Sequence, residues 1–329
     1  MMRRAISCAC ILAAATLVTG GCSRPAQTEG GTSLAIDASR SPWSSPDSTG
    51  QVLTTDHYRI YTTVTRRPLL ELLPGFMEAT YGNYLHLTNL EDRPAPDLMP
   101  IYMMASRREW VLLTENVIRA QRETYLSIEA GGYCYQGVCV FWDIGGVATF
   151  CVAAHEGLHQ FFRHRLRNPL PLWLEEGLCV SSEGHRIEEN RVYFTPDQNA
   201  FRFSNLRSAI VNGRWMSIRT VLPLDAGDVA VKGTDAAVSY YAQLWALSTL
   251  LRTDPAYRAG FRRLLADAEA GRFREALKVP PEMIRDLTRR DRSYNRLLAE
   301  PLFRHYISDD LDAFDRRYIA FAKKVAGLE

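Results

Sequence analysis

The amino-acid sequence predicts an α+β fold, with a mixed region over residues 52–190 and a mainly helical region over residues 191–329. Two observations predict it: strand-like and helix-like segments alternate in the first region, and amphipathic helical patterns dominate the second. The chain has 329 residues, of which 47% are hydrophobic, and this is enough to bury a large core. Because no linker-like segment separates the two regions, we expect one composite domain over residues 52–329.

The first 21 residues have the pattern of a secretory signal. Arg3 and Arg4 precede a run of small apolar residues, which is shorter than the roughly 20 apolar residues of a membrane-spanning helix. The run ends in "LVTGGCS", which resembles the lipobox of bacterial lipoproteins, although Thr19 stands where that pattern usually has Leu. The resemblance implies lipidation of Cys22. We therefore expect an exported protein of the cell envelope, either attached to a bacterial membrane through the lipid or periplasmic.

Residues 22–51 are predicted to form a flexible tether between this anchor and the folded domain. They are rich in Ser, Gly, Pro and Thr and poor in apolar residues, so they cannot bury enough surface to offset the entropy lost on ordering. A frayed N-terminus is the alternative. In either case, we expect the folded unit to begin near Val52.

The mixed region begins with a predicted strand and a long helix. "HYRIYTTV", which starts at His57, alternates in the manner of a strand, and "PLLELLPGFMEATYGNYLHLTNL" places apolar residues at helical spacing. A turn-rich break leads to a short apolar strand in "LMPIYMMA" and a helix in "SRREWVLLTENVIRA". "GGYCYQGVCVFWDIGG" is bounded by glycine pairs and rich in aromatic and β-branched residues, which predicts a hairpin or an edge strand.

The region after Val180 is increasingly helical. Its clearest helix is "DAAVSYYAQLWALSTLLRT". Two further amphipathic patterns follow in "PAYRAGFRRLLADAEAG" and "DDLDAFDRRYIAFAKKVAG".

"CVAAHEGLHQFF", residues 151–162, carries the pattern of a metal site. His155 and His159 are four residues apart, so on a helix they project from the same face, close enough for both imidazoles to reach one ion. Glu156 is rotated by about 100° from His155, which lets its carboxylate reach a water on the open side of the metal. These are the two ligands and the general base of the H-E-x-x-H motif. The alternative is an ordinary amphipathic helix with its two histidines hydrogen-bonded in a polar patch.

A catalytic zinc needs a third protein ligand, and "WLEEGLC" downstream resembles the gluzincin metallopeptidases. In that family the third ligand is the Glu of a W-L-x-E-G-x-A segment, on the helix after the H-E-x-x-H helix. The matching residues in this chain are Trp173, Leu174, Glu176 and Gly177. The resemblance therefore implies one Zn²⁺ ion held by His155, His159 and Glu176. Glu175, at the variable position of the segment, is the competing candidate for the third ligand.

The same resemblance implies roles for two further residues. Glu183 lies seven residues after Glu176, on the same helix face, where its carboxylate can accept the remaining N–H of a ligating imidazole. A solvated surface residue is the alternative. Gluzincins commonly stabilise the oxyanion with a Tyr or His from the later helical region, and Tyr241 fits because it precedes "AQ". Tyr240 and His185 are the alternatives, and a purely structural role for Tyr241 is also open.

The wider order of elements resembles the peptidase-MA-like bacterial proteins of unassigned function, many of which are lipoproteins. It implies a gluzincin-like metallopeptidase fold over residues 52–329, with the H-E-x-x-H helix in the mixed region. Metallopeptidases commonly bind substrate by strand addition, so the resemblance also implies that the strand around Val138 to Trp142 binds an extended peptide. A plain structural strand is the alternative.

Four cysteines follow Cys22, and an even number in an oxidising compartment suggests disulfides. One hypothesis pairs Cys151 with Cys179, which would join the two metal-bearing helices, and Cys134 with Cys139, which would close the hairpin. A second makes Cys151 or Cys179 a metal ligand, although three better-placed ligands exist. A third treats both as small buried hydrophobes. The gluzincin pattern usually has a small Ala where this chain has Cys179.

Together these features predict an exported zinc-dependent peptidase that hydrolyses peptide bonds, with Glu156 as the general base on a zinc-bound water. We expect a peptide or protein substrate, contact with the membrane through the lipid anchor, and no nucleic-acid partner, because the net charge is only +2 and no basic stripe is present. "GGYCYQG" stands where aminopeptidases of this group carry an acidic amine-binding motif, which argues against an aminopeptidase. The alternative is a non-catalytic envelope binding or scaffold lipoprotein on a degenerate peptidase fold.

Overall fold

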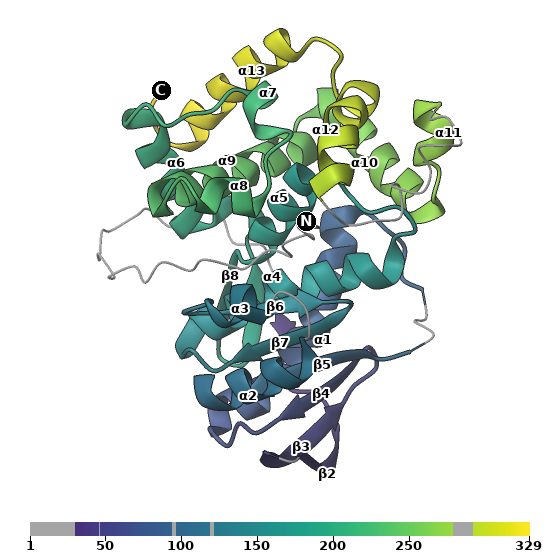
Figure 1. Cartoon of the computed structure of the whole chain (residues 1–329), viewed down its shortest axis with the longest axis vertical. Helices are drawn as coiled ribbons and strands as arrows, with labels where there is room; N and C mark the ends of the chain where they lie inside the picture. Colours follow the sequence, from purple (N-terminus) through teal and green to yellow (C-terminus); the bar gives the residue numbers. More distant parts are fainter. Residues whose placement is uncertain (1–29, 46, 94–96, 119–121, 279–291) are drawn as a thin grey trace.

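A computed structural model describes residues 30–45, 47–93, 97–118, 122–278 and 292–329. Within them the chain is a mixed α+β protein, which confirms the predicted fold class. A sheet lies at one end of the molecule and the helical region at the other, with α4 (Gly146–Arg165) and α5 (Leu172–Ser182) between them (Figure 1). The predicted signal over residues 1–21 and the predicted lipidation site at Cys22 lie outside the described residues.

The main sheet has six strands in the order β2-β3-β4-β5-β7-β6. These are β2 (Ser39–Ser45), β3 (Ser48–Thr54), β4 (Tyr58–Thr62), β5 (Met99–Met104), β6 (Gly132–Tyr135) and β7 (Val138–Trp142). Strands β4, β5 and β7 are parallel, and the other neighbouring pairs are antiparallel. Helices α1 (Arg67–Thr88) and α4 cover one face, and α2 (Arg107–Val117) and α3 (Arg122–Leu126) cover the other.

Side chains of β7 alternate between the two cores on either side of this sheet. Cys139 and Phe141 join the core under α1 and α4, whereas Val140 and Trp142 join the core under α2 and α3. The period of two residues therefore fixes which face of β7 meets the helix with the H-E-x-x-H motif.

The structure corrects the predicted tether over residues 22–51. Its described part contains strand β1 (Thr32–Ser33), all of β2 and most of β3, so the folded unit begins before the predicted boundary. Strands β2 and β3 pair along their whole length, and Trp43 of β2 packs edge-on against Tyr61 and Tyr102. The polar composition of this segment suggested that it is not folded, but a polar strand is stabilised by the hydrogen bonds and side-chain contacts that it makes with the sheet it joins.

A second, three-stranded sheet has the order β1-β9-β8, with β8 at His185–Glu188 and β9 at Arg191–Phe194. Glu189 and Asn190 connect β8 to β9 with positive φ angles of 49° and 58°, as a tight two-residue hairpin turn requires. The region predicted as helical therefore begins with a strand. This hairpin packs against α1 and follows directly after α5.

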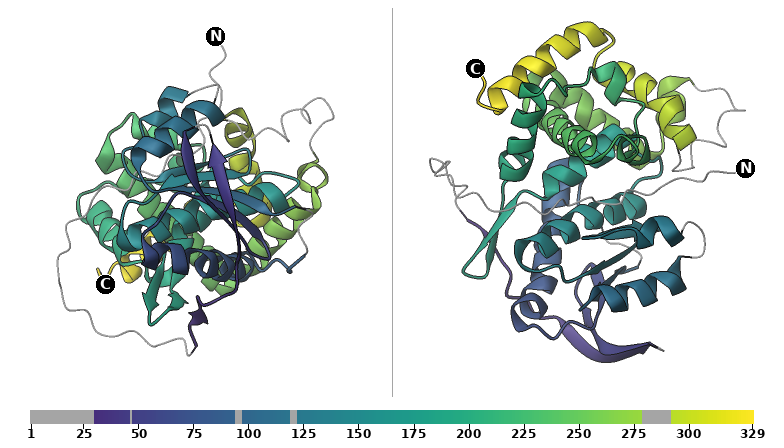
Figure 2. Two further views of the ribbon diagram at one scale, coloured as in Figure 1. Left: turned by 90° about the horizontal axis from the view of Figure 1, so that it is seen from below. Right: turned by 60° about the vertical axis from the view of Figure 1, so that its left-hand side comes forward.

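The helical region surrounds α9 (Thr234–Thr253), most of whose side chains are buried. It lies on the side of α4 away from the main sheet (Figure 2). The strong helical patterns predicted from sequence correspond to α9, α10 (Pro255–Ala270) and α13 (Leu311–Val325), which confirms them. The other elements are η1 (Pro196–Gln198), α6 (Ala200–Val211), α7 (Ile218–Val221), α8 (Ala226–Ala230), α11 (Phe273–Leu277) and α12 (Arg292–Tyr306). Among the described residues, no helix combines the length and apolar character needed to cross a membrane.

Candidate metal centre

Helices α4 and α5 carry the residues of the two sequence motifs. The turn from β7 into α4 has φ angles of 90° at Gly145 and 49° at Gly146, which glycine adopts without the strain that a Cβ would add. At the start of α5, the amide of Leu172 donates a 2.9 Å hydrogen bond to Oδ1 of Asn295 in α12. The otherwise unsatisfied first turn of α5 is thus tied to the C-terminal helices.

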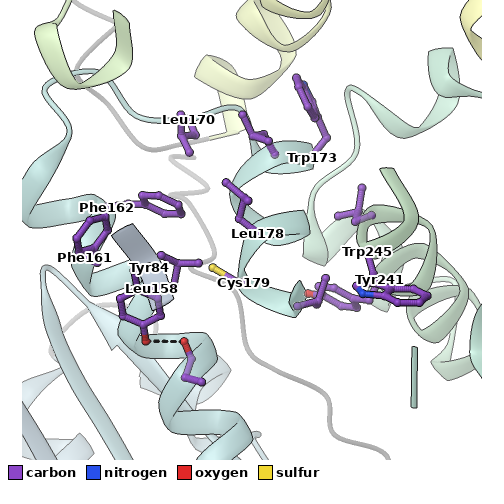
Figure 3. Close-up of a cluster of buried hydrophobic side chains, with 14 of the residues drawn as sticks. Tyr84, Leu158, Phe161, Phe162, Leu170, Trp173, Leu178, Cys179, Tyr241 and Trp245 are labelled. Carbon is purple, nitrogen blue, oxygen red and sulfur yellow. Dashed lines mark hydrogen bonds between the residues drawn. The ribbon is translucent and has the colours of Figure 1, made fainter. Parts of the chain in front are cut away.

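Two glycines inside the motifs allow other helices to approach closely. A Cβ at Gly157 would lie 2.4 Å from the Tyr84 hydroxyl of α1, and a Cβ at Gly177 would lie 2.8 Å from a backbone carbonyl of α9. The Tyr84 hydroxyl donates to the Ala154 carbonyl of α4 over 2.7 Å (dashed line in Figure 3). The same carbonyl accepts a 3.0 Å hydrogen bond from the Ser182 hydroxyl of α5. Helices α1, α4 and α5 therefore meet at one backbone oxygen.

The structure brings His155, His159 and Glu176 together. Nε2 of His155 lies 3.6 Å from Oε2 of Glu176, and Nε2 of His159 lies 3.6 Å from Oε1 of the same carboxylate. The His155 and Glu176 side chains are almost fully buried, and that of His159 is 12% exposed. Cys179 is also close: His155, His159 and Cys179 offer ligand atoms that lie within 4.8 Å of one another, a group that could hold a metal ion.

Each imidazole is oriented by a different carboxylate. Nδ1 of His155 lies 2.8 Å from Oε1 of Glu183, and Nδ1 of His159 lies 2.9 Å from Oε1 of Glu175. An ionised carboxylate only accepts, so each Nδ1 carries a proton, and in the neutral imidazole Nε2 then keeps its lone pair for a metal. The structure thus places Glu183 where the sequence expected it. Glu175 was the competing third ligand, but its position beside Nδ1 favours Glu176 for that role.

Sequence reasoning missed Arg202, which anchors Glu183 from α6. Its guanidinium donates to both carboxylate oxygens of Glu183 over 2.8 to 3.0 Å, and both side chains are at least 90% buried. Asn199 caps α6 and also contacts Oε2 of Glu183 at 3.5 Å. Burial alone would raise the pKa of Glu183, but Arg202 and His155 outweigh it and lower this pKa. No specific signal in the sequence pointed to this role, because Arg202 is one of two arginines in a helix of mixed polarity.

The electrostatics of the cluster fit a bound cation. Glu156 is fully buried. Within the described part of the chain, neither of its carboxylate oxygens makes a hydrogen bond of ordinary geometry, nor does Nε2 of His159. Burial raises the pKa of Glu156 to about 7, although His155 and His159 act to lower it. Burial lowers the pKa of His159, but Glu176 and Glu175 outweigh it and raise this pKa to about 9 in the metal-free protein. Buried polar atoms without partners are costly, and a divalent cation among these groups would remove much of that cost.

The three candidates for oxyanion stabilisation lie in different surroundings. The Tyr240 hydroxyl donates to the Leu224 carbonyl at 3.2 Å, which indicates a structural role. Tyr241 has its ring 5.7 Å from the guanidinium of Arg202 and lies near Trp245, on the α9 side of α5, whereas Cys179 points toward α4 (Figure 3). The catalytic role of Tyr241 stays a prediction.

His185, the third candidate, begins strand β8 and packs its ring 5.0 Å from that of Phe76. Both of its ring nitrogens are buried. Burial lowers the pKa of His185 to about 4, despite a smaller opposing influence of Glu183. The imidazole is therefore neutral near pH 7.

The predicted disulfides are wrong, because no two of the four described cysteines lie at disulfide distance. Cys134 and Cys139 face each other across β6 and β7, but the Cys139 thiol donates to the Glu156 carbonyl at 3.2 Å. The Cys151 thiol approaches the Glu183 carbonyl at 3.6 Å, one helical turn beyond Cys179. The two cysteines are therefore offset by one helical turn, too far for the predicted disulfide between α4 and α5.

The structure also corrects the expected substrate-binding strand. Residues Val138 to Trp142 form β7, which pairs with β5 on one side and with β6 on the other. The edge of the sheet next to α4 is β6 instead. The backbone amide of Cys134 in β6 is close enough to Glu156 to lower the pKa of its carboxyl group. An extended ligand that adds a strand on this side of the sheet would therefore pair with β6.

These geometric features are the basis for assigning a function, since no family model, no curated protein and no solved structure matches this chain.

Proposed function

We propose that this protein is a zinc-dependent peptidase of the gluzincin type, with His155, His159 and Glu176 as ligands. One observation carries the proposal: each imidazole Nε2 faces a different oxygen of Glu176 at 3.6 Å, while each Nδ1 is held by a separate carboxylate. Two oriented imidazoles and one carboxylate are the protein ligands of a catalytic zinc site. The resemblance of both motifs to the gluzincins supports the same assignment.

The residues around this site supply the acid–base chemistry of hydrolysis. A zinc ion held there supplies Lewis acidity, because it polarises a carbonyl group and makes water more acidic. Glu156 takes a proton from the attacking water and donates it to the amine that leaves. Burial favours the protonated form of this carboxyl group and so raises its pKa, which supports a residue that must both take up and release a proton. Tyr241 remains our proposed donor to the oxyanion.

A peptide is the substrate class that the sheet edge favours. Strand β6 ends the sheet beside α4, so one side of its backbone has no neighbouring strand in the described residues. Such an edge binds an extended main chain by adding a strand. A peptide bound in this way would pass close to Glu156, because Cys134 of β6 is its neighbour.

We also propose that the protein is exported and lipidated at Cys22, so that it works at the surface of a bacterial membrane. The signal-like residues 1–21 support this proposal. Mass spectrometry of the mature protein tests it: a diacylated N-terminal Cys22 is expected, and an unmodified peptide that retains the first 21 residues would contradict it.

The function is tested by combining metal analysis with an unbiased peptide-cleavage profile. Wild-type protein is expected to contain about one zinc ion per chain and to cleave peptides. Glu176→Gln should bind zinc more weakly and lose cleavage, whereas Glu156→Gln should keep the wild-type zinc content and lose only cleavage. Glu188→Gln, in an exposed carboxylate of β8, is the matched control and should resemble wild type.

Two results would contradict the proposal. Wild-type protein without a stoichiometric divalent metal would exclude the zinc site. A protein that binds zinc but cleaves no peptide of the library would favour the non-catalytic binding or scaffold role.

A further inference from the structure

Cys179 occupies a position that the proposed zinc site does not use. It follows Glu176 by three residues on α5, so both side chains lie on the same helix face. The Cys179 thiol and the nearest ring nitrogens of His155 and His159 lie within 4.8 Å of one another, and Cys179 is fully buried. Figure 3 shows its sulfur directed from α5 toward α4.

We propose that the Cys179 thiolate is a fourth metal ligand, so that the resting centre is a closed His–His–Glu–Cys site. This inference rests on the proposed metal site and changes its resting state. A catalytic zinc keeps one position for water, whereas a site with four protein ligands is closed. Water and substrate then reach the metal only when the sulfur leaves it.

The distances allow this fourth bond. With Zn–S near 2.3 Å and Zn–N near 2.0–2.1 Å, a tetrahedral site places sulfur and nitrogen about 3.6 Å apart. The limit of 4.8 Å between the present atoms therefore requires movements of about 1 Å or less for each side chain. Glu176, on the same helix, already lies 3.6 Å from Nε2 of each imidazole, so the four side chains converge on one region between α4 and α5.

The chemistry of the ligands points the same way. A thiolate is a strong zinc ligand, and metal binding displaces the thiol proton to solvent as the Zn–S bond forms. Glu156 is buried beside the two histidines, and among the described residues no hydrogen bond of ordinary geometry satisfies its carboxylate oxygens, so a cation in this cluster would offset part of the cost of burying it. The other three described cysteines are directed elsewhere, because Cys139 and Cys151 approach backbone carbonyls and Cys134 lies on β6.

Cobalt substitution gives a readout that does not depend on activity. Co²⁺ bound by a thiolate has an intense sulfur-to-metal charge-transfer band in the near ultraviolet, and Co²⁺ bound only by nitrogen and oxygen lacks it. We expect this band in the wild-type protein and in Cys151→Ala, the matched control on α4. Cys179→Ala should lose the band, keep about one metal ion per chain through the other three ligands, and bind it more weakly.

Peptide cleavage by the zinc forms provides the second readout. Cys179→Ala is expected to cleave at least several-fold faster than wild type at saturating zinc, because the open position is then always accessible. Cys179→Ser should lose the charge-transfer band as well, since its hydroxyl is a poor ligand. Circular dichroism of each variant confirms that it is folded.

The outcomes separate this inference from the proposed function. Wild-type protein that binds cobalt stoichiometrically without a charge-transfer band would overturn the fourth ligand and leave the zinc peptidase intact. A band that persists in Cys179→Ala would also overturn it. Failure of the wild-type protein to bind any divalent metal would overturn both.

Discussion

The two imidazoles of the proposed metal centre are supported in different ways. His155 is fully buried, and its orienting carboxylate, Glu183, is clamped by Arg202 from α6. His159 is 12% exposed, and its orienting carboxylate, Glu175, comes from the same turn of α5 as Glu176. One ligand therefore depends on how the helical region is assembled, whereas the other depends on the local geometry of α4 and α5. Variants on the two sides should have different effects.

The largest effect is expected on the His155 side, from Arg202→Met. It leaves the buried Glu183 carboxylate without its cation, which should reduce the free energy of unfolding by about 3–5 kcal/mol. Denaturant titration of the metal-free protein measures this change. Arg304→Gln removes an exposed ion pair with Glu300 and is the control that should stay close to wild type. Equal stability of the two variants would mean that Arg202 does not anchor Glu183.

Gly157 lies between the two histidines, and its replacement tests whether they move together. In Gly157→Ala the new Cβ would meet the Tyr84 hydroxyl at 2.4 Å, so α1 or α4 must shift. We expect a loss of stability of about 1–3 kcal/mol and weaker metal binding. Tyr84→Phe removes the obstructing oxygen, so the double variant should recover part of the loss in a thermal melt. No recovery would show that the contact with Tyr84 is not the cause.

On the His159 side, Glu175→Gln tests the local support alone. The amide cannot orient Nδ1 as a carboxylate does, so zinc affinity should fall by about 10- to 100-fold. The free energy of unfolding should change much less than in Arg202→Met. Competition with a chromogenic chelator measures the zinc affinity. A loss of stability as large as that of Arg202→Met would remove the distinction between the two sides.

The smallest effect concerns pH and involves His185, two residues after Glu183. Its folded-state pKa of about 4 lies below the ordinary value of 6.5. Between pH 6.5 and pH 4 the unfolded chain therefore binds more protons than the folded protein. The free energy of unfolding is unaffected by His185 above pH 6.5 and decreases as the pH falls from 6.5 toward 4. Between pH 7 and pH 5 the wild type should lose about 1–2 kcal/mol relative to His185→Phe. Parallel stability curves for the two proteins would contradict this assignment.

The sequence predicted those parts of the centre that depend on helical periodicity. The spacing of His155 and His159 is fixed within one helix, and Glu176 follows a second motif on the next helix, so their convergence was foreseeable. The support from Arg202 was not, because it depends on the packing of α6 against the end of α5. The role of Glu175 depends on the rotation of α5 about its own axis, which adjacent glutamates in a sequence do not reveal.

The incorrect predictions about the fold have the same cause: they concern features that depend on packing between elements and not on the sequence of one element. Strands β2 and β3 were read as a tether because their order comes from pairing and from contacts such as Trp43 with Tyr61, not from their own composition. The failed pairing of Cys151 with Cys179 has a similar origin: both cysteines face the opposing helix, but the axial offset between α4 and α5 cannot be read from either helix alone.

The Ala154 carbonyl has a mechanical consequence for the whole molecule. It accepts hydrogen bonds from the Tyr84 hydroxyl of α1 and from the Ser182 hydroxyl of α5. A motion that separated α5 from α4 would break the bond from Ser182, immediately beside a ligand of the proposed ion, whereas the bond from Tyr84 lies within the half of the molecule that contains the main sheet. In the proposed peptidase, these contacts thus help to keep the ligands on α4 and the ligand on α5 at a fixed separation during turnover.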